Sequence, residues 1–287
     1  LPGRRDRLDV SADHRPLSGR PGLKDPSMTD SVLSRFQTGD LGQAVQAALA
    51  EVKRRPTDMA ARLTLGEMLC FADDIERADI HFEAAQRLAG DDNARPLLLR
   101  NLLRAETSRR HVFAGGGLPE FLAEPTAFMR AALRALAGDH AARIGDPDQP
   151  PLRVTCDGLT AEGFRDIDDV TAEIIEVLTA TGRYYWVSPR DLTMLAFQPP
   201  KRPCDLLWRR ARIAGADGAN GEVFIPVLYP TRAPQGPDAL RLGFETDWIA
   251  EPGRPVRGVG QRLMLIGDEA KGVMEIGTLA FTLATPA

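Results

Sequence analysis

The residues of this chain that could do acid–base or metal chemistry are few, and the densest group of them is acidic. Asp166, Asp168 and Asp169 lie close together in the sequence. Such a cluster could hold a divalent cation or act as a general acid and base. The same residues could instead cap a helix beginning near Val170, with their carboxylates in water. Capping is the favoured interpretation, because no second oxygen-rich cluster is evident.

Other catalytic signatures are weak. Histidine, the usual general base near neutral pH, occurs only at His14, His81, His111 and His140. HExxH, GxSxG and zinc-ligand spacings do not occur. Gly258-Val259-Gly260 begins like a dinucleotide fingerprint, but Leu263 replaces its third glycine. The sequence therefore predicts a non-enzyme without metal or cofactor. The alternative is an enzyme with an interdomain acidic site that uses Asp166, Asp168 or Glu245.

Composition indicates a soluble globular protein of one large or two ordinary domains. The 287 residues are 43% hydrophobic and 26% charged. The net charge of −4 favours neither nucleic acid nor an anionic membrane, and no apolar run approaches the roughly 20 residues of a membrane span. Cys70, Cys156 and Cys204 form no CxxC pair, which predicts buried thiols in a reducing compartment, the cytoplasm.

Helical periodicity dominates the first half of the chain. Leu65 to Ala85 has the spacing of a tetratricopeptide helix–turn–helix unit, with Gly66 small enough for close helix packing. A first helix pair, from Thr29 to Pro56, is in phase with it at an interval of about 34 residues. Further helices are expected at 94–110 and 125–137, joined by a glycine corner at 115–117. Residues 28–140 are thus predicted to form a TPR-like domain, and residues 1–27 a disordered or artefactual extension.

The second half has a different pattern. Residues 141–151 read as a linker, and residues 152–287 as an α+β domain with a mostly antiparallel sheet. One helix is expected at 169–180. Trp186 is predicted to lie in the core, whereas Trp248 could lie in the core or on a partner surface. Short runs rich in β-branched or aromatic residues predict strands at 152–156, 184–188, 195–198, 206–213, 223–229, 262–266 and 273–276.

The concave face of the helical repeats is the predicted protein-binding surface. Such a face can accept an amphipathic helix from a partner. A C-terminal segment of the same chain, or a second copy, could fill it instead. The residues expected on this face are Leu63, Glu67, Cys70, Phe71, Leu97, Asn101 and Arg104.

Several segments together resemble the ImpE family, also called TagJ or SciE-type proteins. The resemblance runs from about Met28 to Ile276, and one departure is the stretch at 168–172, where family members often have an arginine and Leu-Gly-Pro. The matching segments are DMAARLTLGEMLCFADDIERADIHFEAA, AETSRRHVFAGGGLPEFLAEP, GRYYWVSPRDL, PCDLLWRRARI, GEVFIPVLYP, DALRLGFETDW and GVGQRLMLIGDE.

The resemblance implies an accessory role in bacterial type VI secretion. It implies a helical-repeat domain joined to an α+β domain, with no enzymatic activity. It further implies that the chain binds the N-terminal helix of the small contractile-sheath subunit and, through it, influences sheath recycling by the associated ATPase. Nucleic acid and membrane are not expected partners. A purely structural scaffold that forms homo-oligomers through its sheet edge is a further alternative, and the sequence leaves the oligomeric state open.

Overall fold

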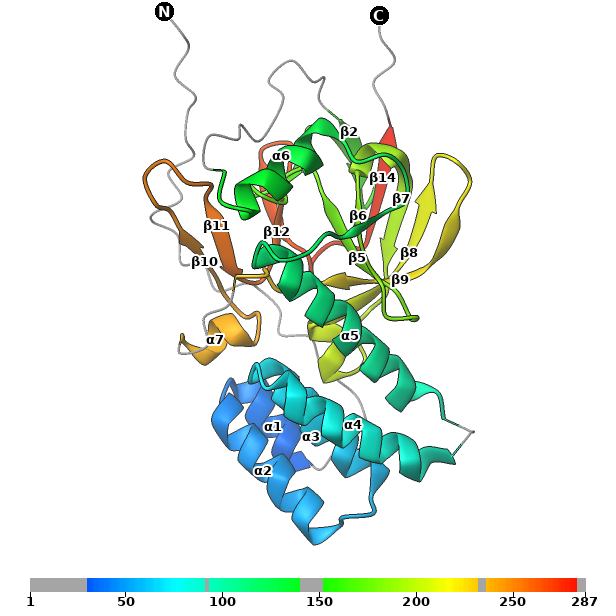
Figure 1. Cartoon of the computed structure of the whole chain (residues 1–287), viewed down its shortest axis with the longest axis vertical. Helices are drawn as coiled ribbons and strands as arrows, with labels where there is room; N and C mark the ends of the chain where they lie inside the picture. The colour runs from blue at the N-terminus through cyan, green and yellow to red at the C-terminus, as the bar shows by residue number, and fades with distance from the viewer. Residues whose placement is uncertain (1–29, 91–92, 140–151, 232–235, 283–287) are drawn as a thin grey trace, which may run out of the picture.

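Helices make up the first half of the chain and strands most of the second (Figure 1). The structure, a computed structural model, describes residues 30–90, 93–139, 152–231 and 236–282. The predictions for residues 1–27 and for the linker at 141–151 therefore fall outside the described residues.

Six helices form in the first half because apolar positions recur at helical spacing, and aspartates cap the starts of three of them, α2, α3 and α4. Asp40, Asp58 and Asp74 each accept the backbone N–H of the residue three positions on. Successive helices pack against one another from α1 to α5. The helix pairs are therefore present, while the tetratricopeptide classification remains a prediction. The helices are α1 (Asp30–Thr38), α2 (Leu41–Arg54), α3 (Met59–Phe71), α4 (Ile75–Ala89), α5 (Arg95–Phe113) and α6 (Ala127–Leu136).

A small residue allows α3 and α4 to approach closely. A Cβ atom at Gly66 would lie 2.3 Å from Cε1 of Phe82, well inside van der Waals contact. Ala78 and Ala85 on α4 are fully buried on the same seam. Helix α3 is buried along most of its length, because other parts of the chain cover it on several sides.

The strands form one large sheet and two small ones. The nine-stranded sheet has the order β1-β6-β5-β9-β8-β7-β14-β2-β3, and all its pairs are antiparallel except β1 with β6. The predicted mixed architecture with a mostly antiparallel sheet is confirmed. The strands are β1 (Glu120–Phe121), β2 (Arg153–Cys156), β3 (Leu159–Glu162), β4 (Phe164–Asp166), β5 (Ile175–Leu178), β6 (Tyr184–Val187), β7 (Leu192–Phe197), β8 (Trp208–Gly215), β9 (Asn220–Pro226), β10 (Thr246–Ile249), β11 (Arg257–Gly260), β12 (Leu263–Ile266), β13 (Glu269–Gly272) and β14 (Thr278–Thr282).

The smaller sheets are β13-β12-β4 and β10-β11, and three short helices complete the described chain. These are η2 (Pro189–Asp191), η3 (Pro203–Leu206) and α7 (Asp238–Arg241). None of the described helices has the length and apolar character needed to cross a membrane.

The helix predicted at 169–180 is wrong. Residues 175–178 instead form β5, which pairs with β6 and β9 and is buried on both faces. A continuous apolar run in a central strand can resemble a buried helix, because neither shows strict alternation. The β-branched residues Ile175 and Val177 suit the strand, and tertiary packing outweighs the weak helical pattern.

The strand predicted at 273–276 is also wrong, because these residues form a turn. Val273 and Ile276 are fully buried, which explains their strand-like composition. Their carbonyl oxygens accept hydrogen bonds from Nη1 of Arg209, at 2.5 and 2.8 Å. A side chain therefore satisfies backbone groups that a strand would have paired with a neighbour.

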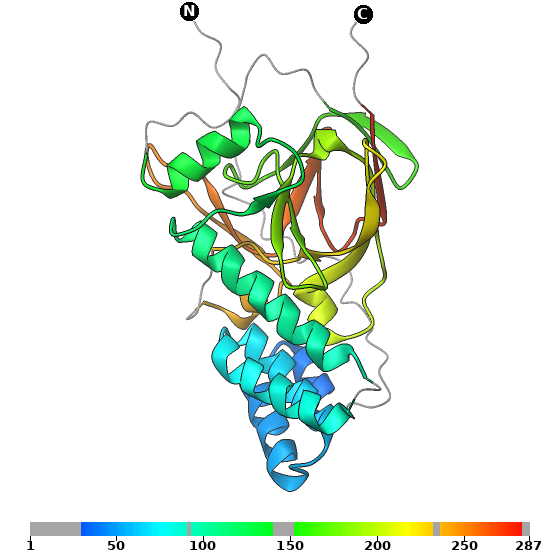
Figure 2. The same cartoon turned by 45° about the vertical axis from the view of Figure 1, so that its right-hand side comes forward.

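Helix α5 connects the two halves of the molecule. Figure 2 shows it running from the helical bundle up to the strands. Its end is fixed by the predicted glycine corner. Gly115 adopts a φ of +77°, and a Cβ there would lie 2.7 Å from the carbonyl oxygen of Leu136. Gly116 and Gly117 pack against the imidazole of His111, so the triplet serves close packing, in keeping with the predicted corner.

A second contact joins the start of α2 to the C-terminal half. The backbone N–H of Leu41 donates to Oδ2 of Asp238 at 2.9 Å, which places a carboxylate at the positive end of that helix. Beside it, the rings of Phe36 and Phe244 meet edge to face with centroids 6.5 Å apart. The helical half is thus fixed to the strands at more than one point.

Candidate functional site

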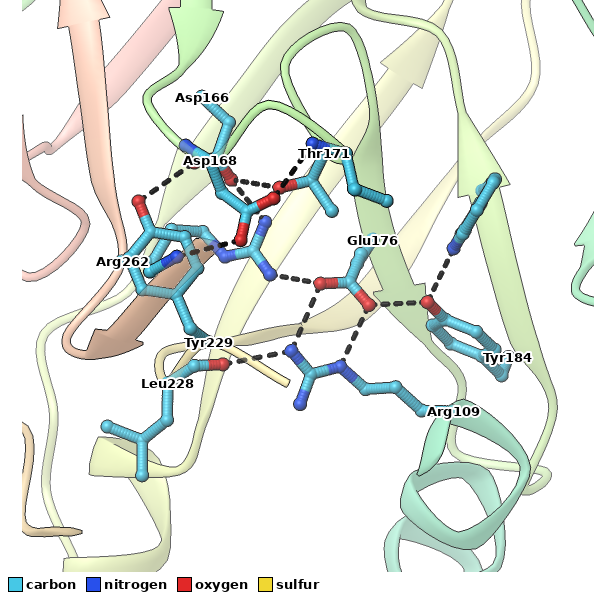
Figure 3. A network of polar contacts seen from close by, with 12 residues as sticks. Arg109, Asp166, Asp168, Thr171, Glu176, Tyr184, Leu228, Tyr229 and Arg262 are labelled. Atoms are coloured by element: carbon cyan, nitrogen blue, oxygen red, sulfur yellow. Dashed lines mark hydrogen bonds and ion pairs between the residues drawn. The ribbon is translucent and has the colours of Figure 1, made fainter. Parts of the chain in front are cut away.

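A row of buried charges joins α5 to the strands, and Figure 3 shows its members pointing toward one another. Arg109 lies on α5, Glu176 on β5, Arg262 directly before β12, and Asp166 on β4. Each of these four residues is only 1% exposed. We call them the charge network. Its signs alternate from Arg109 to Glu176 to Arg262 to Asp166, so every charge has an opposite neighbour.

Glu176 is the centre of the network. Arg109 binds it through two nitrogens, Nε to Oε1 at 2.8 Å and Nη2 to Oε2 at 3.0 Å. Arg262 binds Oε2 from the other side and also donates to Oδ2 of Asp166 at 2.5 Å. Two-pronged guanidinium–carboxylate pairs are geometrically specific. Arg109 also donates to the carbonyl of Leu228 at 2.9 Å, so it joins α5 both to the Glu176 side chain and to the backbone that follows β9.

Hydroxyl and indole groups satisfy the remaining acceptors. The Tyr184 hydroxyl donates to Oε1 of Glu176 and accepts from Nε1 of Trp186. The Tyr229 hydroxyl donates to Oδ1 of Asp166 at 2.9 Å, and Thr171 donates to Oδ2 at 3.0 Å. Each carboxylate oxygen of Glu176 and Asp166 thereby accepts two hydrogen bonds. A buried carboxylate needs such saturation to remain ionised.

The other two aspartates of the acidic cluster have separate partners. Asp168 is buried and accepts from Nε of Arg257 at 3.0 Å and from the backbone N–H of Gly258 at 2.9 Å. It also accepts from the N–H of Val170, which is the predicted turn chemistry. Asp169 is half-buried and accepts from the N–H of Val256 at 2.8 Å. Helix capping with all three carboxylates in water is therefore wrong. No helix follows, and two of the three are buried.

The contacts of the charge network join α5 to the strands, and its carboxylates offer no free position for catalysis. Asp166 and Glu176 have no acceptor position left for a substrate, and Glu245 is exposed and outside the network. Within the ranges that the structure describes, no three His, Cys, Asp or Glu side chains are placed to bind a metal. A cavity of about 40 Å³ is lined by residues between Val32 and Thr64, including Glu51 and Arg55. None of the three aspartates of the acidic cluster lines it. The acidic cluster thus acts as a structural joint.

The environment shifts the two network carboxylates in opposite directions. Burial alone would raise the pKa of Glu176, but Arg109 and Arg262 outweigh it and lower that pKa from 4.5 to about 2. For Asp166 burial is the largest influence. Together with the charge of Asp168 it outweighs Arg262, so the pKa of Asp166 is raised from 3.8 to about 6.

These shifts predict how stability depends on pH. Glu176 should add stability of ~3 kcal/mol that is complete above about pH 4.5 and lost as pH falls toward 2. Asp166 has the opposite sign. The folded state holds its proton more tightly, so ~3 kcal/mol should be lost as pH rises from 3.8 to about 6. Urea unfolding of Asp166→Asn should show a flatter profile between pH 4 and 7 than wild type. Glu124→Gln, whose side chain is 92% exposed, should keep the wild-type slope.

Four of the predicted contact residues lie in the interior. Leu63, Glu67, Cys70 and Phe71 are all buried on α3. Phe71 packs edge to face against Phe36 of α1, with centroids 4.9 Å apart. Glu67 pairs with Arg95 and lies beside the thiol of Cys204 in η3. Glu67 therefore faces η3 of the C-terminal half, whereas Phe71 faces α1.

The other three predicted contact residues lie on α5. Leu97 is 46% exposed and is open to a partner. Nδ2 of Asn101 donates to the carbonyl of Ala180 at 2.7 Å, and the exposed Arg104 lies beside Gly182 in the same β5–β6 turn. The structure does not bring the predicted residues together into one open surface. Their role in partner binding remains a prediction.

Sequence reasoning missed Arg109, Glu176 and Arg262. A signal was present, because Glu176 interrupts the apolar strand IEVL and Arg262 directly precedes the apolar strand LMLI. A charge that a buried strand carries needs a buried partner of opposite sign. The tryptophans behaved largely as expected. Trp186 is buried as predicted, and Trp248 is half-buried with its ring 5.7 Å from that of Tyr229.

Comparison with known proteins gives a consistent result. Residues 158–280 match the sequence model of the ImpE protein family. The chain is 28% identical over 283 residues to the type VI secretion system accessory component TagJ of Pseudomonas aeruginosa, which covers 94% of this chain and 98% of that protein. The crystal structure of protein VPA1032 from Vibrio parahaemolyticus shares the fold, with a TM-score of 0.80 at 23% identity over 88% of this chain and 98% of that one. The predicted resemblance is confirmed.

Proposed function

We propose that this chain, whose residues 158–280 match the ImpE family model, works as a non-enzymatic accessory component of a bacterial type VI secretion system. The observation that carries the proposal is the extent of the similarity to TagJ. It spans 98% of that protein and so includes both the helical half and the strands. A shared fold alone would not carry a function.

The charge network supports a role without catalysis. Its carboxylates are saturated by the chain's own donors, so they hold the two halves together and leave no general acid or base there. The three cysteines are free and buried. Proteins that use helical-pair units commonly bind other proteins, which agrees with an adaptor role.

The proposed partner is the small subunit of the contractile sheath, bound through its N-terminal helix in the cytoplasm. Binding would in turn modulate sheath recycling by the associated ATPase. Leu97 is the exposed anchor proposed for this helix, and the other proposed contact residues of the helical half are Asn101, Arg104 and the buried Leu63, Glu67, Cys70 and Phe71.

Calorimetric titration of the full chain with a synthetic peptide of that helix tests the proposal. We expect a Kd of about 1 μM or tighter, which corresponds to about −8 kcal/mol. Leu97→Asp should weaken binding at least tenfold, because it places a charge on the exposed anchor. Leu122→Asp is the matched control, since Leu122 is also exposed but follows β1. Phe71→Asp is unsuitable, because a buried charge would unfold the protein. The absence of both heat and co-purification with the sheath subunit would contradict the proposal.

A further inference from the structure

The contact between α3 and η3 is unusual in its chemistry. Glu67 lies at its centre and is 1% exposed. Its ion-pair partner is the guanidinium of Arg95, from the first turn of α5, and the thiol of Cys204, from η3, lies beside it while donating to Oδ1 of Asp205 at 3.9 Å. A thiol is one of the weakest hydrogen-bond donors in proteins. The charge on α3 is therefore met on the η3 side only by a weak neutral donor.

Burial strongly affects the pKa of the Glu67 carboxyl group. It raises the pKa of Glu67, although Arg95 and the neighbouring Cys204 thiol act in the opposite direction. Among the described residues, Glu67 has a single guanidinium partner, Arg95, whereas Glu176 has two, Arg109 and Arg262. A second cation facing Glu67 would form a charge-assisted bond, which is roughly twice as strong as one between neutral groups.

Segment η3 keeps its own shape without help from α3. The carboxylate of Asp205 accepts the backbone N–H groups of Lys201 and Arg202, at 2.7 and 3.0 Å. The N–H of Asp205 donates to the carbonyl of Arg202, and that of Leu207 to the carbonyl of Cys204. These bonds close the turn on itself. Its next backbone link leads to β9, from Val227 to Leu207, and not to a helix.

The exposed and buried residues of η3 and its flank are divided as in a ligand docked on a protein surface. Lys201 and Arg202 are exposed, whereas Pro203, Cys204 and Leu206 are buried against the rest of the molecule. An element with internally satisfied backbone that contacts its neighbour through a few side chains can leave without orphaning main-chain groups. The cost of its release is then mainly the exposure of those side chains.

From these contacts we propose that η3 is an internal occupant of the α3 face around Glu67, and that an amphipathic partner helix with a basic residue opposite Glu67 binds by displacing it. The inference rests on the proposed function and adds regulation to it. The partner's lysine or arginine takes the place of the Cys204 thiol, and its apolar side chains replace Pro203 and Leu206. The apparent affinity for the partner helix is then the intrinsic affinity multiplied by the fraction of molecules in which η3 is displaced.

The chain contains its own reporter of this displacement. Full-length wild-type protein is treated with iodoacetamide, with and without a saturating amount of the sheath-subunit peptide, and alkylation is mapped by mass spectrometry. We expect Cys204 to react at least tenfold faster when the peptide is bound. Cys156, buried on β2, is the internal control and should keep its rate. Binding that leaves the Cys204 rate unchanged, or slows it, overturns the inference while the proposed function stands.

Affinity provides the second measurement. Cys204→Ala removes a donor that holds η3 in place and should tighten peptide binding about fivefold, whereas Cys156→Ala should leave it within twofold. Exchange of the peptide's basic residues for glutamine should weaken binding to wild type about tenfold but have little effect on binding to Glu67→Gln. Equal affinities of the two alanine variants, with no coupling to Glu67, count against the inference. If the peptide binds none of the proteins, the proposed function fails and the inference fails with it.

Discussion

Replacing Arg109 with methionine is expected to lower the free energy of unfolding by about 3–5 kcal/mol. The change leaves Glu176 buried beside Arg262 alone, and it removes the donor to the Leu228 carbonyl. Breaking a buried pair is costly because the remaining charge keeps its desolvation penalty without the compensating attraction. Urea unfolding monitored by circular dichroism measures the loss, provided that the transition is two-state.

Two comparisons isolate the buried charge in that experiment. Arg87→Met removes an exposed pair with Glu83 on α4 and should cost at most about 1 kcal/mol. The double variant Arg109→Met with Glu176→Met should cost less than the sum of the two single changes, because Arg262 then retains Asp166. Arg109→Met unfolding within 1 kcal/mol of wild type would show that the joint contributes little.

Gly260→Ala should be the second most damaging change, with a loss of about 3 kcal/mol. Gly260 has a φ of +89°, which costs an L-residue roughly 1–2 kcal/mol. Its Cβ would also lie 2.2 Å from the carbonyl oxygen of Glu245 and 3.0 Å from Cδ2 of Leu240. Overpacking against backbone adds about 1–3 kcal/mol, because the neighbour cannot rotate away.

Gly218→Ala separates strain from collision. Gly218 has nearly the same φ, +88°, but a Cβ there would meet nothing within 4 Å. We expect its loss to be limited to the strain, about 1–2 kcal/mol. Thermal unfolding of both variants at one pH gives the comparison. Equal losses would mean that the contact with Glu245 relaxes freely and that only backbone conformation matters.

The glycines at 258 and 260 also show how a motif can mislead. Their spacing resembles the start of a dinucleotide fingerprint, yet each glycine here makes room for the chain itself. A Cβ at Gly258 would enter the ring of Tyr229 at 2.3 Å, and Tyr229 is the residue that donates to Asp166. The absence of a Cβ atom at Gly258 therefore leaves the space that Tyr229 occupies beside the charge network.

The helical half was predictable because its determinants are local. N-cap residues and 3.6-residue periodicity are local to each helix, so α2, α4 and α6 could be placed from sequence. The strand β5 could not, because all four of its side chains are buried and the pattern carries no alternation. Its identity depends on β6 and β9, which lie at a distance in the chain.

The site was harder still, because its charges come from four distant segments. Arg109 and Glu176 are 67 positions apart, and Arg262 is 86 positions beyond Glu176. Nothing near Arg109 in the sequence distinguishes it from Arg110, which is 25% exposed and pairs with Asp73. Likewise, the apolar residues of α3 were visible in the sequence, but periodicity alone does not say whether a partner or η3 covers them.

The joint at α5 also bears on how such proteins can diversify. The range that matches the ImpE family begins at residue 158, after Arg109, β1 and β2. Yet β1 pairs with β6, and Arg109 neutralises Glu176. Recombination between two relatives near residue 150 would separate these pairs and join mismatched charges in the interior. The halves are therefore expected to be inherited together, with substitutions at Arg109 and Glu176 tolerated only in concert.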